Sequence, residues 1–160
     1  MLYGEGWLNF DSSPTLRLER LPLVGQQLGR FAGNARPFPK DVRYGDISKG
    51  LPVPPNSARG IYASHVLEHL ALDDFRKALV NTLSMLEPGG VFRLIVPDLE
   101  GRARRYIESA AARSTDASGT FMRTCHPGME QRPRSLLGRI RLLIGGSAHL
   151  WMWDEAAMTD

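Results

Sequence analysis

The fold is decided by residues 60–96, GIYASHVLEHLALDDFRKALVNTLSMLEPGGVFRLIV. Apolar runs at Gly60–Ser64 and Val91–Val96 predict two buried strands. Between them, apolar residues recur at the spacing of one helix face: Leu72, Phe75, Leu79, Leu83 and Leu86. Asp73 or Asp74 is expected to cap this helix, and Pro88-Gly89-Gly90 is expected to end it.

A strand, a helix of about four turns and a second strand form a βαβ unit, whose strands run parallel through a right-handed crossover. Two further short strands are expected upstream, at Trp7–Asp11 and Asp41–Ile47. The prolines of LPVPPN, residues 51–56, predict a loop before the βαβ unit. The predicted fold class is α/β, a Rossmann-like three-layer fold with helices on both faces of a mostly parallel sheet. We expect residues 1–160 to form a single domain.

The segment after Pro97 is rich in arginine. We expect a basic helix at Leu99–Ala112, a loop at Ser114–Pro133 and a short amphipathic helix at Ser135–Ile144. Such a basic surface suits an anionic substrate, a membrane surface or RNA. A solvated arginine-rich face is the favoured interpretation, because arginine outnumbers lysine 17 to 3 throughout the chain.

Composition excludes several classes of protein. The chain is 42% hydrophobic and 23% charged, as in ordinary globular domains, and its net charge of +3 is too small to argue for nucleic acid. The N-terminal residues lack a signal-peptide pattern, and no stretch approaches the ~18 apolar residues of a membrane span. Cys125 is the only cysteine, so an internal disulfide is excluded and a cytoplasmic location is expected.

Polar groups follow the predicted strands where each one ends. These groups are Asp11, Asp46, Ser64-His65 and Asp98. In open parallel sheets, ligands bind at the carboxyl ends of the strands. A carboxylate there can accept hydrogen bonds from both vicinal hydroxyls of a ribose, whereas any one such aspartate taken alone is explained by turn formation. The set as a whole favours a cofactor that contains a nucleoside.

Four segments resemble class I S-adenosylmethionine-dependent methyltransferases, and within that class the type 11 group. They are GWLNFD (6–11), VRYGDI (42–47), IYASHVLEHL (61–70) and LEPGGVFRLIVPDLEG (86–101). HLWMWDE (149–155) is similar to a segment before the last helix of the same group. The resemblance implies methyl transfer from S-adenosylmethionine. We expect a small-molecule or glycan-type acceptor, no nucleic-acid partner and no membrane span, and weak peripheral membrane contact is left open.

Site residues follow from this resemblance. Asp11 corresponds to the acid that binds the cofactor ribose, and Asp46-Ile47 to the pair that holds the adenine ring. Ser64-His65 corresponds to the segment that lines the sulfonium and methyl group. His65 is the nearby side chain suited to accept a proton near neutral pH, so it is the predicted catalytic residue.

The sequence departs from the family at both ends. The ten residues before Asp11 contain Gly4 and Gly6 but not the family's glycine-rich loop, and the chain stops before the family's final helix and strand pair. We therefore expect a domain incomplete at both ends that binds S-adenosylmethionine weakly. A truncated enzyme that is inactive as it stands and a non-enzymatic remnant or binding module both remain open.

His65-Val66-Leu67-Glu68-His69 also has the form H-x-x-E-H, the zinc motif of one group of metallopeptidases. On a helix, both histidines and the glutamate would share a face. A related alternative keeps the methyltransferase fold and has His65, Glu68 and His69 bind a divalent cation. Because the motif directly follows a strand, we favour polar contacts at a helix start for Glu68 and His69 and predict no metal ligands.

Overall fold

The structure is a computed structural model that describes residues 6–25, 27, 29, 37–126, 134, 135, 138 and 148–159. The chain divides into two compact units. Unit 1 consists of Met1–Pro52 and Pro133–Gly146, and unit 2 of Val53–Arg132 and Ser147–Asp160.

Unit 1 contains the two upstream strands that the sequence predicts. Strand β1 (Asn9–Asp11) pairs in parallel with β2 (Val42–Tyr44), and Asp11 lies opposite Tyr44. Both strands are shorter than predicted. Strand β1 begins at Asn9 instead of Trp7, and β2 ends at Tyr44 because the chain then enters a 3-10 turn, η1 (Ile47–Lys49).

Helix α1 (Pro14–Glu19) follows β1 and is tied to the start of β2. Ser13 caps the helix by accepting a hydrogen bond from the backbone of Thr15, and Pro14 suits the first turn because it needs no hydrogen-bond partner for its nitrogen. The buried Glu19 carboxylate accepts a hydrogen bond from the backbone N–H of Phe38 at 2.8 Å. Among the described residues of this unit, the buried apolar side chains are those of Leu16 and Val42.

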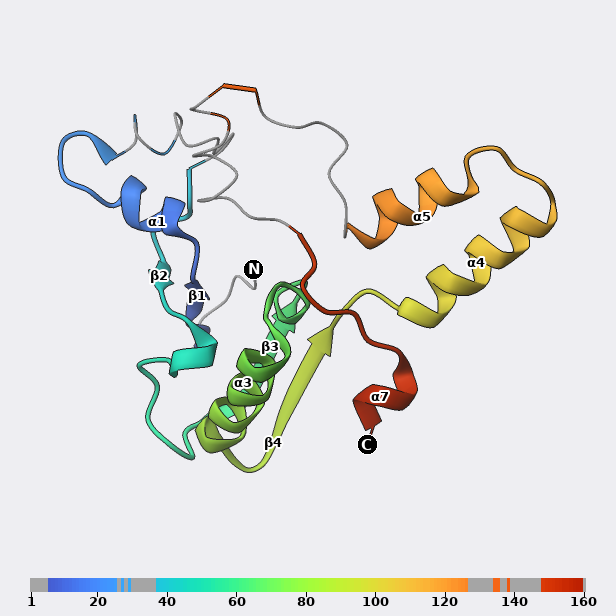
Figure 1. Ribbon diagram of the computed structural model, residues 1–160. Helices are drawn as coiled ribbons and strands as arrows, with labels where there is room; N and C mark the ends of the chain where they lie inside the picture. The colour runs from blue at the N-terminus through green and yellow to red at the C-terminus, as the bar shows by residue number, and fades with distance from the viewer. Residues whose placement is uncertain are drawn as a thin grey trace. The chain divides into compact units, whose positions relative to one another are not determined.

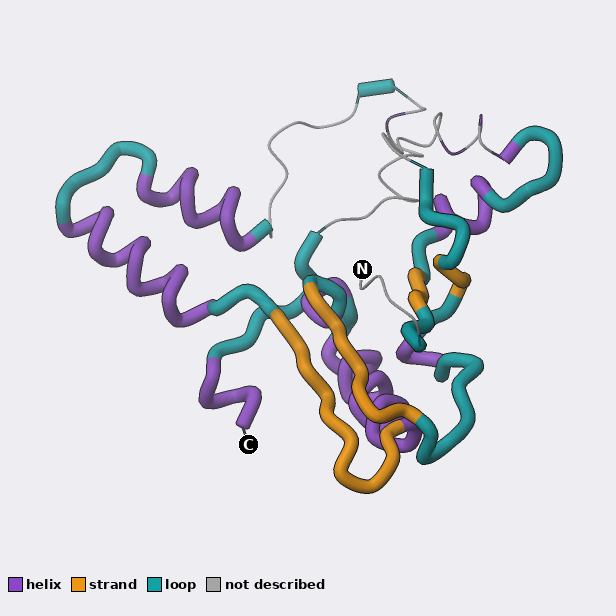
Figure 2. The backbone as a smooth tube through the Cα atoms, turned by 180° about the vertical axis from the view of Figure 1, so that it is seen from behind, coloured by secondary structure: helices purple, strands orange, loops and turns teal. Residues whose placement is uncertain are grey.

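Unit 2 is built on the predicted βαβ segment. Strand β3 (Ala58–Ser64) leads through the turn η2 (Leu67–His69) to helix α3 (Leu72–Met85), and β4 (Leu86–Ile95) returns parallel to β3. Helix α3 lies along the two strands, as Figures 1 and 2 show from opposite sides. The α/β fold class is confirmed, although each sheet has two strands among the described residues.

The predicted ends of α3 are wrong in detail. Its N-cap is Ala71, which has no side chain able to cap the helix. Asp73 and Asp74 lie in the first turn and pair with Lys77 at 3.6 and 2.9 Å. The helix ends at Met85, and Pro88-Gly89-Gly90 lies within the span of β4. A register shift opposite Ala58 and Gly60 accommodates this tripeptide, and Gly89 takes a φ of +83°.

The buried face of α3 also differs from the predicted stripe. The buried side chains are Phe75, Ala78, Thr82 and Met85. Leu83, predicted to face the core, is 73% exposed. Each residue advances about 100° around a helix, so the choice between Thr82 and Leu83 rotates the buried face by about a quarter turn.

Beyond β4, helix α4 (Leu99–Ala111) confirms the predicted basic helix. Helix α5 (Ala117–Cys125) lies where a loop was expected, so that prediction is wrong. The two helices pack together, and the rings of Tyr106 and Phe121 lie 5.3 Å apart. A short helix, α7 (Glu155–Thr159), follows near the C-terminus.

The predicted helix at 135–144 lies outside the described residues, apart from residues 135 and 138. Among the described residues, none of the helices has the length and apolar character needed to cross a membrane.

Candidate functional site

In unit 1, the carboxyl ends of β1 and β2 bring Asp11 and Asp46 to the same edge of the sheet. Gly45 N–H donates to the carbonyl of Asp11 at 3.1 Å, which continues the pairing one residue beyond β2. Gly45 suits this position because a Cβ atom there would lie 2.8 Å from Cδ1 of Phe10 and 2.7 Å from Cδ2 of Leu51. The turn that carries Asp46 is therefore packed directly against the end of β1.

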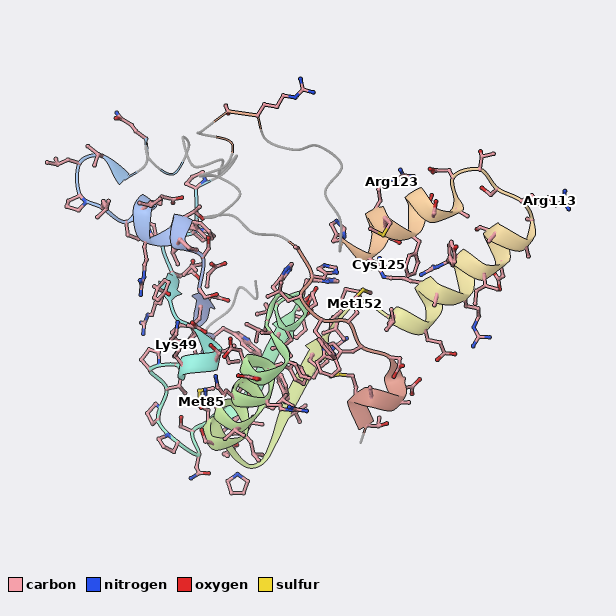
Figure 3. The ribbon with its side chains drawn as sticks, viewed as in Figure 1. Lys49, Met85, Arg113, Arg123, Cys125 and Met152 are labelled. Atoms are coloured by element: carbon pink, nitrogen blue, oxygen red, sulfur yellow. The ribbon has the colours of Figure 1, made fainter. Side chains whose placement is uncertain are left out.

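Local hydrogen bonds hold both carboxylates. Asp11 Oδ1 accepts from Ser13 N–H at 2.6 Å, and Oδ2 of Asp11 accepts no hydrogen bond from the described residues. Asp46 Oδ1 accepts from the backbone and hydroxyl of Ser48 at 3.1 and 2.7 Å. Its Oδ2 accepts from Lys49 Nζ at 2.7 Å, and Figure 3 labels this lysine.

These contacts set the charge state of Asp46. Partial burial by itself raises the pKa of this carboxyl, but the hydrogen bonds from Lys49 and Ser48 outweigh it and hold the pKa below its ordinary value. Asp46 therefore carries a stable negative charge at the edge of the sheet. The same contact raises the pKa of Lys49.

In unit 2, β3 ends at Ser64, and His65 follows with a left-handed backbone, φ 54°. This conformation is uncommon outside glycine and is held by a hydrogen bond from His65 N–H to the carbonyl of Ile95 at 2.9 Å. His65 Nδ1 lies 3.0 Å from Oε1 of Glu68. The Glu68 side chain is fully buried, whereas that of His65 is 61% exposed.

Glu68 also anchors residues 148–153, here called the C-terminal segment. Its carbonyl accepts hydrogen bonds from the backbone of Leu150 at 2.8 Å and of Trp151 at 3.2 Å. His69 Nδ1 contacts the carbonyl of Ala148 at 3.1 Å. These bonds bring His149 beside the loop that follows β3.

Three side chains converge there. Glu68, His69 and His149 each offer one ligand atom, and these atoms all lie within 4.8 Å of one another. The ring of His126, at the end of α5, lies 5.0 Å from that of His149. Burial lowers the pKa of His149, the nearby Glu68 raises it, and His69 and His126 lower it further, so the net pKa lies below the ordinary value.

The predicted site residues thus lie at strand ends in both units. Asp11, Asp46 and Ile47 lie together at the carboxyl edge of β1 and β2, and Ser64 and His65 lie at the end of β3. Residues 65–69 do not form the α-helix that a peptidase H-x-x-E-H motif needs, because only Leu67–His69 forms a short 3-10 turn.

Sequence analysis missed the roles of Glu68 and His149. The sequence favours a polar contact at a helix start for Glu68, whereas the structure buries its side chain fully. No local pattern around His149 indicates that it lies beside residue 69.

Comparison with known families matches residues 23–94 to the family model described as a methyltransferase domain. Neither the curated proteins nor the solved structures gave a match. The matched range contains Asp46, Ile47, Ser64 and His65, together with β2, β3, α3 and most of β4. Over these residues, the chain is therefore similar to a methyltransferase domain.

Proposed function

We propose that this protein transfers a methyl group from S-adenosylmethionine to a hydroxyl of a small-molecule or glycan-type acceptor in the cytoplasm. The observation that carries the proposal is the His65–Glu68 pair at the end of β3, within the matched methyltransferase range. A buried carboxylate that holds an exposed imidazole is an arrangement suited to proton transfer.

The carboxylates of unit 1 have the chemistry that the adenosine part of the cofactor requires. Asp11 retains an oxygen that the described side chains do not engage, and this oxygen can accept hydrogen bonds from ribose hydroxyls. Asp46 is negatively charged and can accept a hydrogen bond from the exocyclic amine of adenine, with Ile47 beside the ring. When bound, the cofactor supplies an electrophilic methyl group on a sulfonium.

His65 takes the proton in the proposed reaction. The carboxylate of Glu68 can only accept, so Nδ1 of His65 carries the hydrogen and Nε2 keeps its lone pair. As the acceptor oxygen takes up the methyl group that the bound cofactor would supply, its hydroxyl proton would move to Nε2 of His65. Glu68 is a positioning residue, because it fixes the tautomer and the orientation of the ring.

The proposal includes no nucleic-acid partner. Arginine side chains of α4 and α5 bind groups within their own pair of helices, so part of the basic surface is already engaged. Arg104 pairs with Glu100, Arg123 pairs with Asp116, and Arg102 donates to the carbonyl of Thr124.

The first test is cofactor binding, measured by calorimetric titration of S-adenosylmethionine into the full chain. Asp11→Ala should weaken binding by at least about 100-fold, because it removes two charge-assisted hydrogen bonds of ~1.5–3 kcal/mol each. Asp73→Ala, which removes an aspartate 72% exposed on α3, is the matched control and should leave binding unchanged. Equal affinities for wild type and Asp11→Ala would remove Asp11 from the site.

The second part of the test is methyl transfer, with labelled S-adenosylmethionine and a panel of hydroxylated sugars and phenols. His65→Gln should lower kcat by about 10²- to 10⁴-fold with little effect on cofactor affinity. Glu68→Gln should lower kcat less and alter the pH–rate profile. Cofactor binding without transfer to any acceptor would instead favour a binding module.

A further inference from the structure

We propose that Glu68, His69 and His149 bind one divalent transition-metal cation of the zinc class in unit 2. Their ligand atoms lie within 4.8 Å of one another. Two imidazoles and one carboxylate form the ligand set of zinc sites that keep a fourth position open for water or substrate. Magnesium and calcium prefer sites made of oxygen atoms, so this set disfavours both.

Burial of Glu68 is an independent sign of a ligand. Its side chain is fully buried, and Oε2 has no hydrogen-bond partner among the described residues. Leaving a buried carboxylate oxygen unsatisfied is costly, and a cation at this position would remove the cost. His149 Nδ1 is likewise buried without a partner in the described part of the chain.

Hydrogen bonds to neighbouring groups fix the orientation of side chains in this cluster. Metal ligands are commonly oriented in this way by groups that do not themselves touch the metal. The carbonyl of Ala148 can only accept, so Nδ1 of His69 carries its hydrogen and Nε2 keeps the lone pair that a metal needs. His65 holds the other oxygen of Glu68, which leaves Oε2 for the cation.

Modest rotation of the two histidine side chains would bring the three ligand atoms close enough to bind one zinc ion. Tetrahedral zinc, with bonds of about 2.0–2.2 Å, places its ligand atoms about 3.4 Å apart. The two imidazoles are only partly buried, which leaves them room to turn toward Glu68. The bound cation would link the loop after β3 to the C-terminal segment.

This ligand set differs from the one that the H-x-x-E-H motif suggests. That motif would use His65 and His69, but His65 is bonded to Glu68 and lies outside the cluster. It also differs from the sequence-based expectation of no metal, because His149 is 80 residues from His69 along the chain and only the fold brings them together.

The test is calorimetric titration of Zn²⁺ into the untagged, chelator-treated full chain, with Mg²⁺ titrated in parallel. Wild type should bind one Zn²⁺ per chain and show no comparable affinity for Mg²⁺. His69→Gln and His149→Gln should each weaken Zn²⁺ binding by at least about 100-fold, because each removes one ligand. His65→Gln is the matched control and should bind within about 10-fold of wild type, because the amide can still donate to Glu68.

A thermal readout separates loss of binding from loss of folding. Zn²⁺ at 100-fold excess over Kd should raise the Tm of wild type by about 5–10 °C and leave that of His149→Gln unchanged. Circular dichroism in chelator checks that each variant is folded, and His69→Gln decides the result if His149→Gln is not. Failure of wild type to bind Zn²⁺, full binding by His149→Gln, or loss confined to His65→Gln would overturn the proposal. None of these results depends on methyl transfer or on cofactor binding.

Discussion

At the scale of single residues, Asp46 shows how one side chain serves both folding and the proposed site. It begins η1 and binds Ser48 and Lys49 in the absence of any ligand. An adenine amine would therefore meet a carboxylate that is already oriented and charged. The sequence allowed a simpler interpretation, turn formation, and the hydrogen bonds from Ser48 show that Asp46 forms this turn.

The pH dependence of stability tests this orientation. The pKa of Asp46 lies below its ordinary value of 3.8, so folding favours its ionised form. Its contribution to stability is fully present above pH 3.8 and is lost as the pH falls through the lower pKa of the folded state. The free energy of unfolding of Asp46→Asn should be below that of wild type by up to about 1 kcal/mol at pH 6.

The difference between the two proteins should stay nearly constant above pH 3.8 and shrink below it, as measured by urea unfolding from pH 6 to pH 3. A difference that grows as the pH falls would contradict the depressed pKa. Asp73→Asn, which alters a largely exposed pair with Lys77, provides the comparison for a general effect of charge.

At the scale of elements, the packing of α3 separates two apolar residues that periodicity placed on the same buried face, Phe75 and Leu83. Phe75 is 5% exposed and stacks on Trp153, with ring centroids 4.1 Å apart. Leu83 is 73% exposed. Phe75→Ala should lower the free energy of unfolding by about 3–5 kcal/mol, whereas Leu83→Ala should change it by less than about 0.5 kcal/mol.

Denaturant unfolding of the two variants measures this contrast. Because both substitutions create alanine within the same helix, helix propensity affects them similarly and the difference reports burial. A large loss of unfolding free energy in Leu83→Ala would show that Leu83 is buried, as the apolar periodicity predicted.

The elements also show what sequence could predict. Strands β3 and β4 were predictable because their apolar runs are bounded by Pro, Gly and polar residues. The buried face of α3 was not, because leucine at 79 and 83 outweighed Ala78 and Thr82 in a count of apolar residues. Helix α5 was missed because Ser118, Gly119 and Thr120 are weak helix formers, and packing against α4 stabilises it instead.

The residues of the candidate site likewise fall into those that the sequence could predict and those that it could not. The strand-end residues were accessible from sequence, because the end of a strand and the type of residue that follows are both local features. The cluster of Glu68, His69 and His149 was not accessible, because it depends on where the C-terminal segment docks. The resemblance to methyltransferases identified HLWMWDE (149–155) as a related segment, but it did not indicate which residues this segment contacts.

At the scale of the whole molecule, links between distant parts of the chain complete unit 2. The C-terminal segment reaches Glu68 through Leu150 and Trp151, and it reaches the start of α4 through a hydrogen bond from Leu99 N–H to the carbonyl of Trp153 at 2.9 Å. Trp153 also forms a parallel bridge with Asp98. One short segment thus joins the loop after β3 to the chain that leaves β4, and loss of its anchor should loosen both.

Two tryptophans of that segment provide a matched test of this anchoring. Trp153 is 8% exposed and stacks on Phe75, whereas Trp151 is 43% exposed. Trp153→Ala should lower the free energy of unfolding by about 3–5 kcal/mol, and Trp151→Ala by less than about 1 kcal/mol. Hydrogen exchange of the folded proteins locates the effect: in Trp153→Ala, the amides of Leu99 and Leu150 should lose protection together, while those within β3 keep theirs. Unchanged protection at Leu150 would show that the bonds to Glu68 hold the segment without Trp153, and the C-terminal segment would then be anchored at the histidine cluster alone.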